Sequence, residues 1–226
     1  MLEKLYNILL DPFPLRTLSK AVIRKMKLGS YEWRVQAGAV DRPHYGFILY
    51  NAAVLGKKLG VKRISVLEFG VAGGNGILNL EYHAEEISKL TGIGIEIYGF
   101  DTGEGLPSPV DFRDLPYHWK EGFYKMEYSR LSPLLKRTRL VLGDLKDTSK
   151  DFFEKYNPAP IGAVIYDLDF YSSTVTALKM LEAGEQFYLP RVFCYFDDIN
   201  GSELELYSSY TGERLAIREF NAEHDS

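Results

Sequence analysis

The sequence has one cysteine, few histidines and no excess of positive charge, and each shortage excludes a class of protein. Cys194 alone cannot form an internal disulfide, and four histidines without Cys/His spacing provide no zinc motif. With 27 basic against 31 acidic residues, the formal charge of −4 argues against a nucleic-acid partner bound by phosphate neutralisation. Cys194 falls within an apolar run and is expected in the core rather than as a nucleophile.

Long hydrophobic runs are also lacking, and we expect no signal peptide at the start of this sequence. No apolar run reaches the roughly 20 residues that a membrane span needs. The first ten residues include Glu3 and Lys4 and no small-residue cleavage site. We therefore expect no membrane partner and a cytoplasmic location. The length of 226 residues favours one core domain with an appendage.

The chain is rich in aromatic residues and repeats a strand and helix pattern. Phe, Tyr and Trp make up 14% of it, and such rings form pocket walls as well as cores. Apolar residues recur at helical spacing, so residues 1–60 are predicted to be an N-terminal helical cover region. Residues 61–226 are predicted to be the main domain, because β-branched runs there alternate with helical stretches. The expected helices are 15–26, 45–59, 75–90, 145–156, 172–184 and 212–223, and the expected strands are 64–69, 93–100, 139–142, 161–165 and 188–196.

Near-continuous apolar strands joined by helices predict an α/β fold with a Rossmann-like, doubly wound, mostly parallel sheet. Ligands of such sheets bind beyond the carboxyl ends of the strands, and every unusual cluster in this sequence follows a strand. One connection, residues 103–125, is far longer than usual and carries six ring side chains. It is predicted to be a binding loop or lid, with a disordered insertion as the alternative.

A glycine-rich segment follows the first strand. It reads Glu68-Phe-Gly70-Val-Ala-Gly73-Gly74, and glycines allow positive φ angles and close approach of a ligand. Its spacing departs from the dinucleotide fingerprint Gly-x-Gly-x-x-Gly, so a simple tight turn is the alternative.

Single acids close the next two strands. Asp101 ends the second strand, where an acid can accept both hydroxyls of a ribose or can cap the following turn. Asp144 follows the third strand and is a candidate for the adenine end of a ligand, or for the N-cap of the next helix. Glycines and acid together favour nucleoside binding.

Four aspartates follow the fourth and fifth strands, and they are Asp167, Asp169, Asp197 and Asp198. Carboxylates gathered in a partly dry cleft repel one another unless protons or a cation relieve them. Ligands with oxygen alone favour Mg²⁺ or a similar hard divalent ion. The alternative is that Asp169 caps the helix beginning near residue 171 and that one of the later pair caps a loop.

These motifs resemble those of the class I S-adenosylmethionine-dependent methyltransferases, and within them the metal-dependent macrocin-type sugar O-methyltransferases. The resemblance spans about residues 66–220. Its motifs are Glu-Phe-Gly-Val at 68–71, Gly-Phe-Asp at 99–101 with Glu-Gly-Leu-Pro at 104–107, Asp-x-Asp-x-Tyr-x-Ser-Thr at 167–174 and Asp-Asp at 197–198. The sequence departs from the family pattern at Thr102, Gly103 and Ile199. These departures affect the expected shape of the pocket more than its expected chemistry.

The resemblance implies methyl transfer from S-adenosyl-L-methionine to a hydroxyl of a sugar or other polyol acceptor, with Mg²⁺ assistance, in natural-product biosynthesis. The small-molecule acceptor would be a hydroxylated compound such as a glycoside. The implied roles are cofactor binding for Glu68, Gly70, Gly73, Asp101 and Asp144, metal binding for Asp167, Asp197 and Asp198, and general-base catalysis for Asp169.

Two other functions remain open on the sequence. An NAD(P)-dependent oxidoreductase shares the glycine loop and the second-strand acid, although clustered aspartates have no role in hydride transfer. A non-catalytic nucleoside-binding or interaction protein could keep the fold. The family sheet has seven strands, and we expect the last two to be missing or truncated here. The exposed edge this leaves would invite pairing with a second chain, so a homo-oligomer is a further expectation.

Overall fold

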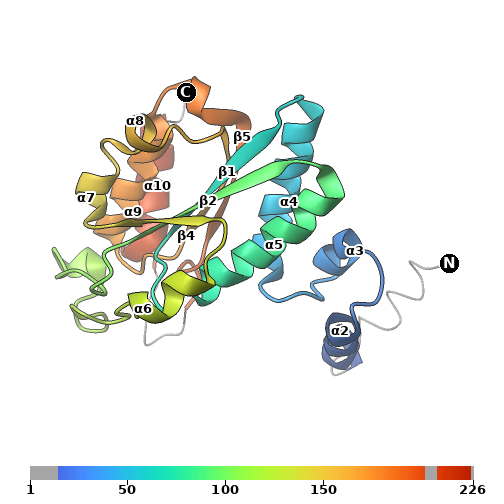
Figure 1. Cartoon of the computed structure of the whole chain (residues 1–226). Coiled ribbons are helices and arrows are strands. Elements are labelled where there is room, and N and C mark those ends of the chain that lie inside the picture. The colour runs from blue at the N-terminus through green and yellow to red at the C-terminus, as the bar shows by residue number, and fades with distance from the viewer. Residues whose placement is uncertain (1–14, 202–207, 225–226) are drawn as a thin grey trace.

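The computed structural model describes residues 15–201 and 208–224. Within these ranges five strands form one parallel sheet in the order β3-β2-β1-β4-β5 (Figure 1). The strands are β1 (Arg63–Phe69), β2 (Gly94–Asp101), β3 (Thr138–Leu142), β4 (Ile161–Tyr166) and β5 (Tyr188–Phe196). The predicted doubly wound α/β sheet is confirmed.

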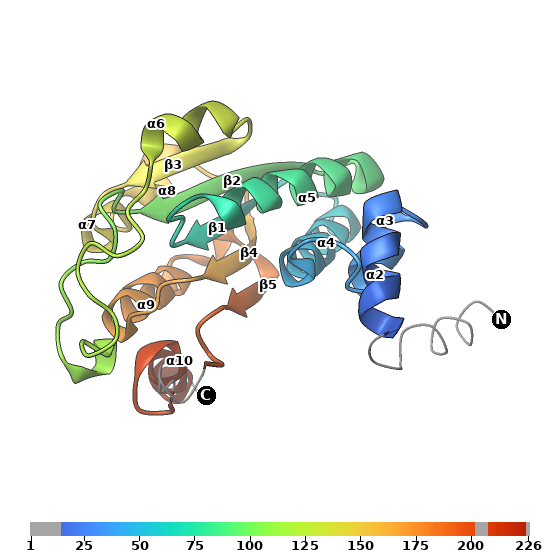
Figure 2. The same ribbon diagram turned by 90° about the horizontal axis from the view of Figure 1, so that it is seen from below.

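Helices cover both faces of the sheet, as Figures 1 and 2 show. The helices are α2 (Leu15–Met26), α3 (Tyr31–Gln36), α4 (Pro43–Lys58), α5 (Asn75–Thr91), α6 (Tyr128–Leu131), α7 (Leu145–Thr148), α8 (Phe152–Tyr156), α9 (Tyr171–Leu178) and α10 (Gly212–His224), with 3-10 turns η1 (Phe112–Asp114), η2 (Ser132–Leu134), η3 (Lys179–Glu182) and η4 (Glu185–Phe187). Helices α3, α4 and α5 pack on one face, and α8, α9 and α10 pack on the other. Along β1, Val66 belongs to the first apolar cluster and Leu67 to the second, because successive strand residues point to opposite faces.

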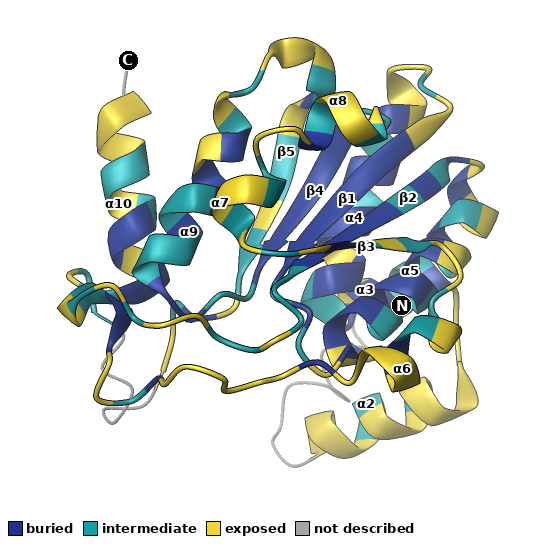
Figure 3. Cartoon of the chain, turned by 60° about the vertical axis from the view of Figure 1, so that its left-hand side comes forward, coloured by how far each residue is buried: buried dark blue, intermediate teal, exposed yellow. Residues whose placement is uncertain are grey.

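Helix α4 is part of the core, whereas α2 is not. Tyr45 and Leu49 on α4 are fully buried and pack in the same cluster as Val66 of β1. No residue of α2 is buried, and Figure 3 shows this helix almost entirely exposed. The N-terminal helices therefore differ in their relation to the sheet, and the division of the chain at residue 60 stays a prediction.

The order of the strands reverses between β1 and β4, and their carboxyl ends meet there. Phe69 pairs with Phe100 of β2 and with Tyr166 of β4. Beyond the strands, Gly70 N donates to Phe100 O and Asp167 N donates to Phe69 O, each at 2.9 Å. The segments after β1, β2 and β4 are therefore brought side by side, at the place where such sheets bind ligands.

Three expectations from the sequence are wrong in detail. The helix expected over residues 172–184 ends at Leu178, after which the chain forms the 3-10 turn η3. The helix expected over residues 145–156 is two short helices, α7 and α8, and the side chain of Thr148 bonds back to the Asp144 carbonyl at 3.1 Å. A threonine hydroxyl that bonds to nearby backbone competes with helix continuation. Cys194 is exposed on β5 rather than buried, because β5 is an edge strand of the sheet. Among the residues the structure covers, no helix is long and apolar enough to cross a membrane.

Candidate functional site

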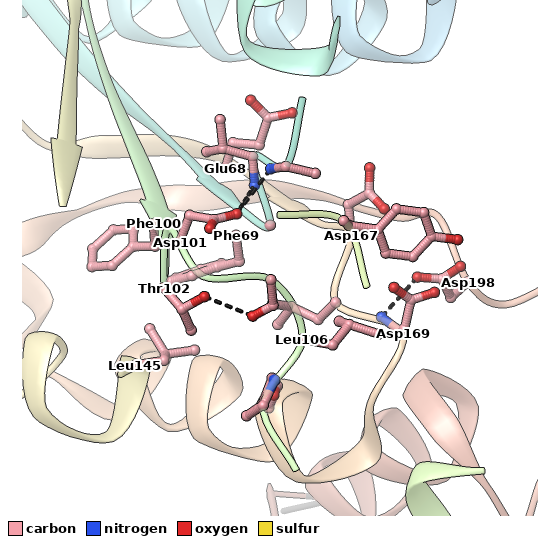
Figure 4. Close-up of a pocket in the computed structure, with 18 of the residues that line it drawn as sticks. Glu68, Phe69, Phe100, Asp101, Thr102, Leu106, Leu145, Asp167, Asp169 and Asp198 are labelled. Carbon is pink, nitrogen blue, oxygen red and sulfur yellow. Dashed lines mark hydrogen bonds between the residues drawn. The ribbon is translucent and has the colours of Figure 1, made fainter. Parts of the chain in front are cut away.

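A cavity of about 760 Å³ lies beyond the carboxyl ends of the strands. This volume is within the range of small-molecule sites. Every candidate site residue predicted from the sequence lines it, and Figure 4 shows Asp101 and Leu145 toward one end and Asp167, Asp169 and Asp198 toward the other. The lining residues predicted from sequence are Glu68, Gly70, Gly73, Asp101, Asp144, Asp167, Asp169, Asp197 and Asp198.

Three carboxylates converge at the ends of β4 and β5. Asp167 follows β4, Asp197 and Asp198 follow β5, and one oxygen of each lies within 4.8 Å of the others. The two strands pair up to Tyr166 and Phe196, and Asp197 N donates to Tyr166 O at 2.9 Å. The parallel register of β4 and β5 therefore carries these acids to one point.

This acid cluster suits a hard divalent cation. Burial, together with repulsion from Asp197 and Asp198, raises the pKa of Asp167 to about 7. Near neutral pH the three side chains therefore need a proton or a cation between them. Each offers only oxygen, and Mg²⁺ binds through a few carboxylate oxygens while keeping water or substrate oxygens in its shell. The donor set fits that ion, and metal binding stays a prediction.

Neighbouring groups hold the acids after β5 in place. The Tyr195 hydroxyl donates to Asp197 Oδ1 at 2.7 Å, and the Asp169 N–H donates to Asp198 Oδ2 at 2.9 Å. On α10, the buried Glu213 accepts the N–H of Asp198 at 3.0 Å. Burial raises the pKa of Glu213 well above its usual value. These contacts orient the cluster before any ligand binds.

Asp169 lies beside the cluster in an unusual backbone conformation. Its φ is 56°, a left-handed value that favours glycine, and it is 8% exposed. The N-cap of α9 is Phe170, which makes no side-chain capping bond. Asp169 is therefore not the N-cap of that helix, and its role as a general base stays a prediction.

Gly70 and Gly73 differ in what surrounds them. Gly70 has φ +87°, and a Cβ added there would lie 1.8 Å from the carbonyl oxygen of Asp167. At Gly73 an added Cβ would meet no atom within 4 Å, and the residue lines the cavity. Gly70 is thus required by backbone packing, whereas Gly73 leaves space that a ligand could fill.

Asp101 holds the glycine-rich loop against the end of β2. Its Oδ2 accepts the N–H groups of Val71 and Ala72 at 2.9 and 2.8 Å, and its Oδ1 accepts that of Gly103 at 2.7 Å. Asp101 therefore caps the turn that follows β2, which was the alternative interpretation of this residue from the sequence. A carboxylate can accept about four hydrogen bonds, so capacity remains for a ribose hydroxyl, and that role stays a prediction.

Asp144 is the N-cap of α7, as one of the two sequence interpretations held. Its Oδ1 accepts the Lys146 N–H at 2.8 Å, and its side chain is exposed. It also lines the cavity next to Leu145. Capping and contact with an adenine are compatible, and the second stays a prediction.

Glu68 is a buried acid between the two ends of the cavity. Its Oε1 accepts the Tyr45 hydroxyl at 2.9 Å, whereas its Oε2 is buried without a partner among the described residues. Burial raises the pKa of Glu68 to about 8. A buried acceptor without a donor is costly, which is typical of a site completed by a ligand.

The long connection after β2 is ordered and packed on α9. Asp114 accepts the N–H groups of Val110 and Ser172, both at 2.8 Å, and the Ser172 hydroxyl at 2.9 Å. Trp119 packs with Phe170, lines the cavity, and has a buried Nε1 without a partner in the described chain. A disordered insertion is thereby excluded, and a role of this loop in ligand binding stays a prediction.

Sequence reasoning missed several residues around the cavity: Arg42 and Tyr45 from the start of α4, Asp114 from η1 and Glu213 from α10. Asp114 lies in the long connection that the sequence singled out, but it was not itself predicted, and the other three belong to no motif that follows a strand. The one local signal was a basic residue before a proline at the start of a helix, which by itself indicates no ligand.

Comparisons with known proteins identify the fold. No protein-family model and no curated protein matches the chain. The crystal structure of CalS11, described as a calicheamicin methyltransferase, matches with a TM-score of 0.58 and 20% identity, over 92% of this chain and 85% of that one. An apo structure of CalS11, described as TDP-rhamnose 3'-O-methyltransferase, an enzyme in calicheamicin biosynthesis, matches with a TM-score of 0.50 and 19% identity, over 92% and 86%.

The fold is therefore that of the class I methyltransferases. The sheet order β3-β2-β1-β4-β5 and the parallel pairing are typical of this class, and N-terminal helices precede the sheet. At about 20% identity the likeness establishes architecture and leaves the activity to be argued from the site.

Proposed function

We propose that this protein is an S-adenosyl-L-methionine-dependent O-methyltransferase that methylates a hydroxyl of a sugar or other polyol in natural-product biosynthesis. One observation carries the proposal. A glycine-rich loop, an acid that ends β2 and a cluster of three carboxylates line a single cavity at the carboxyl edge of the sheet. The likeness to a methyltransferase fold supports it.

The cofactor would occupy the part of the cavity between Gly73 and Asp144. Gly73 leaves open space there, Asp101 retains acceptor capacity, and Glu68 offers an unpartnered oxygen. The bound cofactor supplies an electrophilic methyl group on a sulfonium sulfur. Asp101 and Glu68 would position the cofactor by accepting hydrogen bonds, and Gly73 would leave room for it because it has no side chain.

Asp167, Asp197 and Asp198 would hold Mg²⁺. When bound, the ion supplies Lewis acidity that lowers the pKa of a neighbouring hydroxyl. The protein's contribution is to aim the three carboxylates at one point and to fix them through Tyr195 and Glu213.

Asp169 would accept the hydroxyl proton. It lines the same cavity beside the acid cluster, and its backbone is tied to Asp198. The Asp169 carboxylate would take the proton of the acceptor hydroxyl as that oxygen bonds to the methyl carbon. The electrons of the broken carbon–sulfur bond would pass to the positively charged sulfur, so the donor would leave as a neutral thioether.

The acceptor would lie under the connection of residues 103–125. Leu106, Trp119 and Tyr124 from this segment line the cavity, and aromatic faces suit the apolar faces of sugar rings. CalS11 is described as acting on TDP-rhamnose, which supports a sugar as the acceptor class.

The test combines binding and turnover. We expect calorimetry to show S-adenosylmethionine binding that Mg²⁺ strengthens, and a methyl-transfer assay on a panel of glycosides and catechols to show turnover that requires Mg²⁺. Asp169→Asn should lower turnover by about 100-fold or more. The matched control is Asp147→Asn on the exposed surface of α7, where Asp147 pairs with Lys150 and no change is expected.

Other outcomes would reject the proposal. Binding of NAD(P) in place of S-adenosylmethionine would favour an oxidoreductase, and binding of neither would favour a non-catalytic module. Full turnover by Asp169→Asn would remove that residue from the role of base.

A further inference from the structure

Arg42 has a strained backbone at the edge of the cavity. It is the N-cap of α4 with φ 40° and ψ 63°, both left-handed values. Residues other than glycine rarely adopt these angles, and a residue that precedes a proline, here Pro43, avoids helical conformations further. Strain of this kind is common where a side chain must be presented to a ligand.

The guanidinium of Arg42 is largely unused. It is half-buried and lines the cavity. Nη1 donates to the Tyr45 hydroxyl at 3.1 Å, and among the described residues this is the only hydrogen bond of a side chain with five N–H donors. No ion pair holds it in the described chain either. A planar fork of free donors matches a carboxylate or a phosphate.

The surroundings of Arg42 distinguish between these two anions. Glu68, Asp167 and Asp197 all lie within electrostatic reach of its guanidinium. A phosphate dianion placed there would face these acids without a cationic part of its own to offset them. An α-amino acid group carries an ammonium next to its carboxylate, so its cationic part can face the acids while its anionic part meets the arginine.

Tyr45 sets the spacing of such a pair. Its hydroxyl accepts from Arg42 and donates to Glu68 Oε1, at 3.1 and 2.9 Å. One hydroxyl thus links the guanidinium of Arg42 and the carboxyl group of Glu68 on the wall of the same cavity. The second oxygen of Glu68, buried and without a partner among the described residues, is the acceptor that an ammonium would complete.

We propose that Arg42 binds the α-carboxylate of the methionyl end of the methyl donor, with the neighbouring ammonium directed toward Glu68. This inference rests on the proposed function. It makes Arg42 a residue that determines specificity for a zwitterionic amino-acid group, contributed by the start of α4 rather than by the strand ends.

Two ligands that differ only at that end provide the test. S-adenosylhomocysteine carries the amino-acid group, and 5′-methylthioadenosine has the same nucleoside and sulfur without it. In calorimetry, Arg42→Met should weaken S-adenosylhomocysteine about 10- to 100-fold and leave 5′-methylthioadenosine within about 2-fold. Arg42→Lys should lose less, because the charge remains while the fork is lost.

Arg63→Met is the matched control. Arg63 begins β1, so it lies at the end of the strands away from the cavity, where it pairs with Glu96 at 2.7 Å. Neither ligand should change affinity in this variant. Thermal unfolding verifies that each variant is folded. If Arg42→Met does not fold, the affinities of Arg42→Lys for the two ligands test the inference instead.

The outcomes separate the two proposals. Equal weakening of both ligands by the Arg42 variants, or no weakening of either, would overturn this inference while the proposed function stands. Failure of the unaltered protein to bind S-adenosylhomocysteine would overturn the proposed function, and this inference with it.

Discussion

Gly70 is the residue that most directly fixes the geometry of the cavity. Its backbone lies against that of Asp167, so close that an added Cβ would come within 1.8 Å of the Asp167 carbonyl oxygen. The loop after β1 and the loop after β4 are therefore in contact through main-chain atoms. Gly73, three residues later, has no such neighbour.

This difference predicts opposite effects of one methyl group. Gly70→Ala should lower the free energy of unfolding by more than about 3 kcal/mol, because the Cβ clashes with backbone and φ is +87°. Gly73→Ala should cost less than about 1 kcal/mol yet weaken nucleoside ligands, because the methyl enters the cavity. Urea unfolding and calorimetry measure both. A stable Gly70→Ala would contradict the packing described here.

The sequence could predict the residues that follow strands, but not those that come from helices. All nine predicted residues line the cavity, since each lies at or shortly after the carboxyl end of a strand and the sheet order gathers these ends at one edge. Arg42, Tyr45 and Glu213 reach the same region from α4 and α10. Their position depends on how those helices pack against the sheet, and no local pattern of residues marks it.

Among the elements, the connection after β2 is tied to α9 by one side chain. Asp114 of η1 is fully buried and accepts three hydrogen bonds, two of them from Ser172. The strands of the sheet were predicted within one residue at each end, because buried apolar runs bounded by glycine or acid are a strong signal. The anchoring of this connection by Asp114 was not predicted, because the hydrogen bonds to Ser172 join residues far apart in the sequence.

Removal of the anchor should loosen the connection without unfolding the sheet. Asp114→Ala leaves two N–H groups and a hydroxyl without their acceptor, so we expect a loss of about 2 to 4 kcal/mol in unfolding free energy. Limited proteolysis between residues 103 and 125 should become faster. Asp111→Ala, which removes a surface pair with Arg113, should cost less than about 1 kcal/mol. Equal effects of the two substitutions would rule out the anchoring role.

For the whole molecule, residues from both ends of the chain meet around one cavity. Arg42 precedes the sheet in sequence and Glu213 follows it, and both contact the acids or their neighbours. Acids are buried around this cavity, and burial raises the pKa of Glu68 to about 8 and that of Asp167 to about 7. The stability of the protein should therefore depend on pH in an uncommon direction.

We expect the unfolding free energy to fall between about pH 5 and pH 8 when EDTA removes cations. Glu68 titrates near 4.5 in the unfolded chain and near 8 in the folded one. In that window the folded chain keeps a proton that the unfolded chain has lost, so rising pH destabilises it, by on the order of 2 to 4 kcal/mol. Urea unfolding at several pH values measures this.

Glu68→Gln should flatten much of that decline, since the amide does not titrate, and Asp167 and Glu213, whose pKa values burial also raises, would account for the remainder. Glu127→Gln, at an exposed surface pair with Arg130, is the control and should leave the pH dependence unaltered. A steep decline that persists in Glu68→Gln would show that other groups are responsible.

The contact between Gly70 and the Asp167 carbonyl also bears on how such a protein diversifies. The spacing between the loop after β1 and the loop after β4 is set by contact of main-chain atoms, so an exchange outside that contact leaves it in place. The segment 103–125 packs on α9 through side chains such as Asp114 and Trp119. Under the proposed function, substitutions in that segment would change the acceptor that the protein takes without moving the two loops.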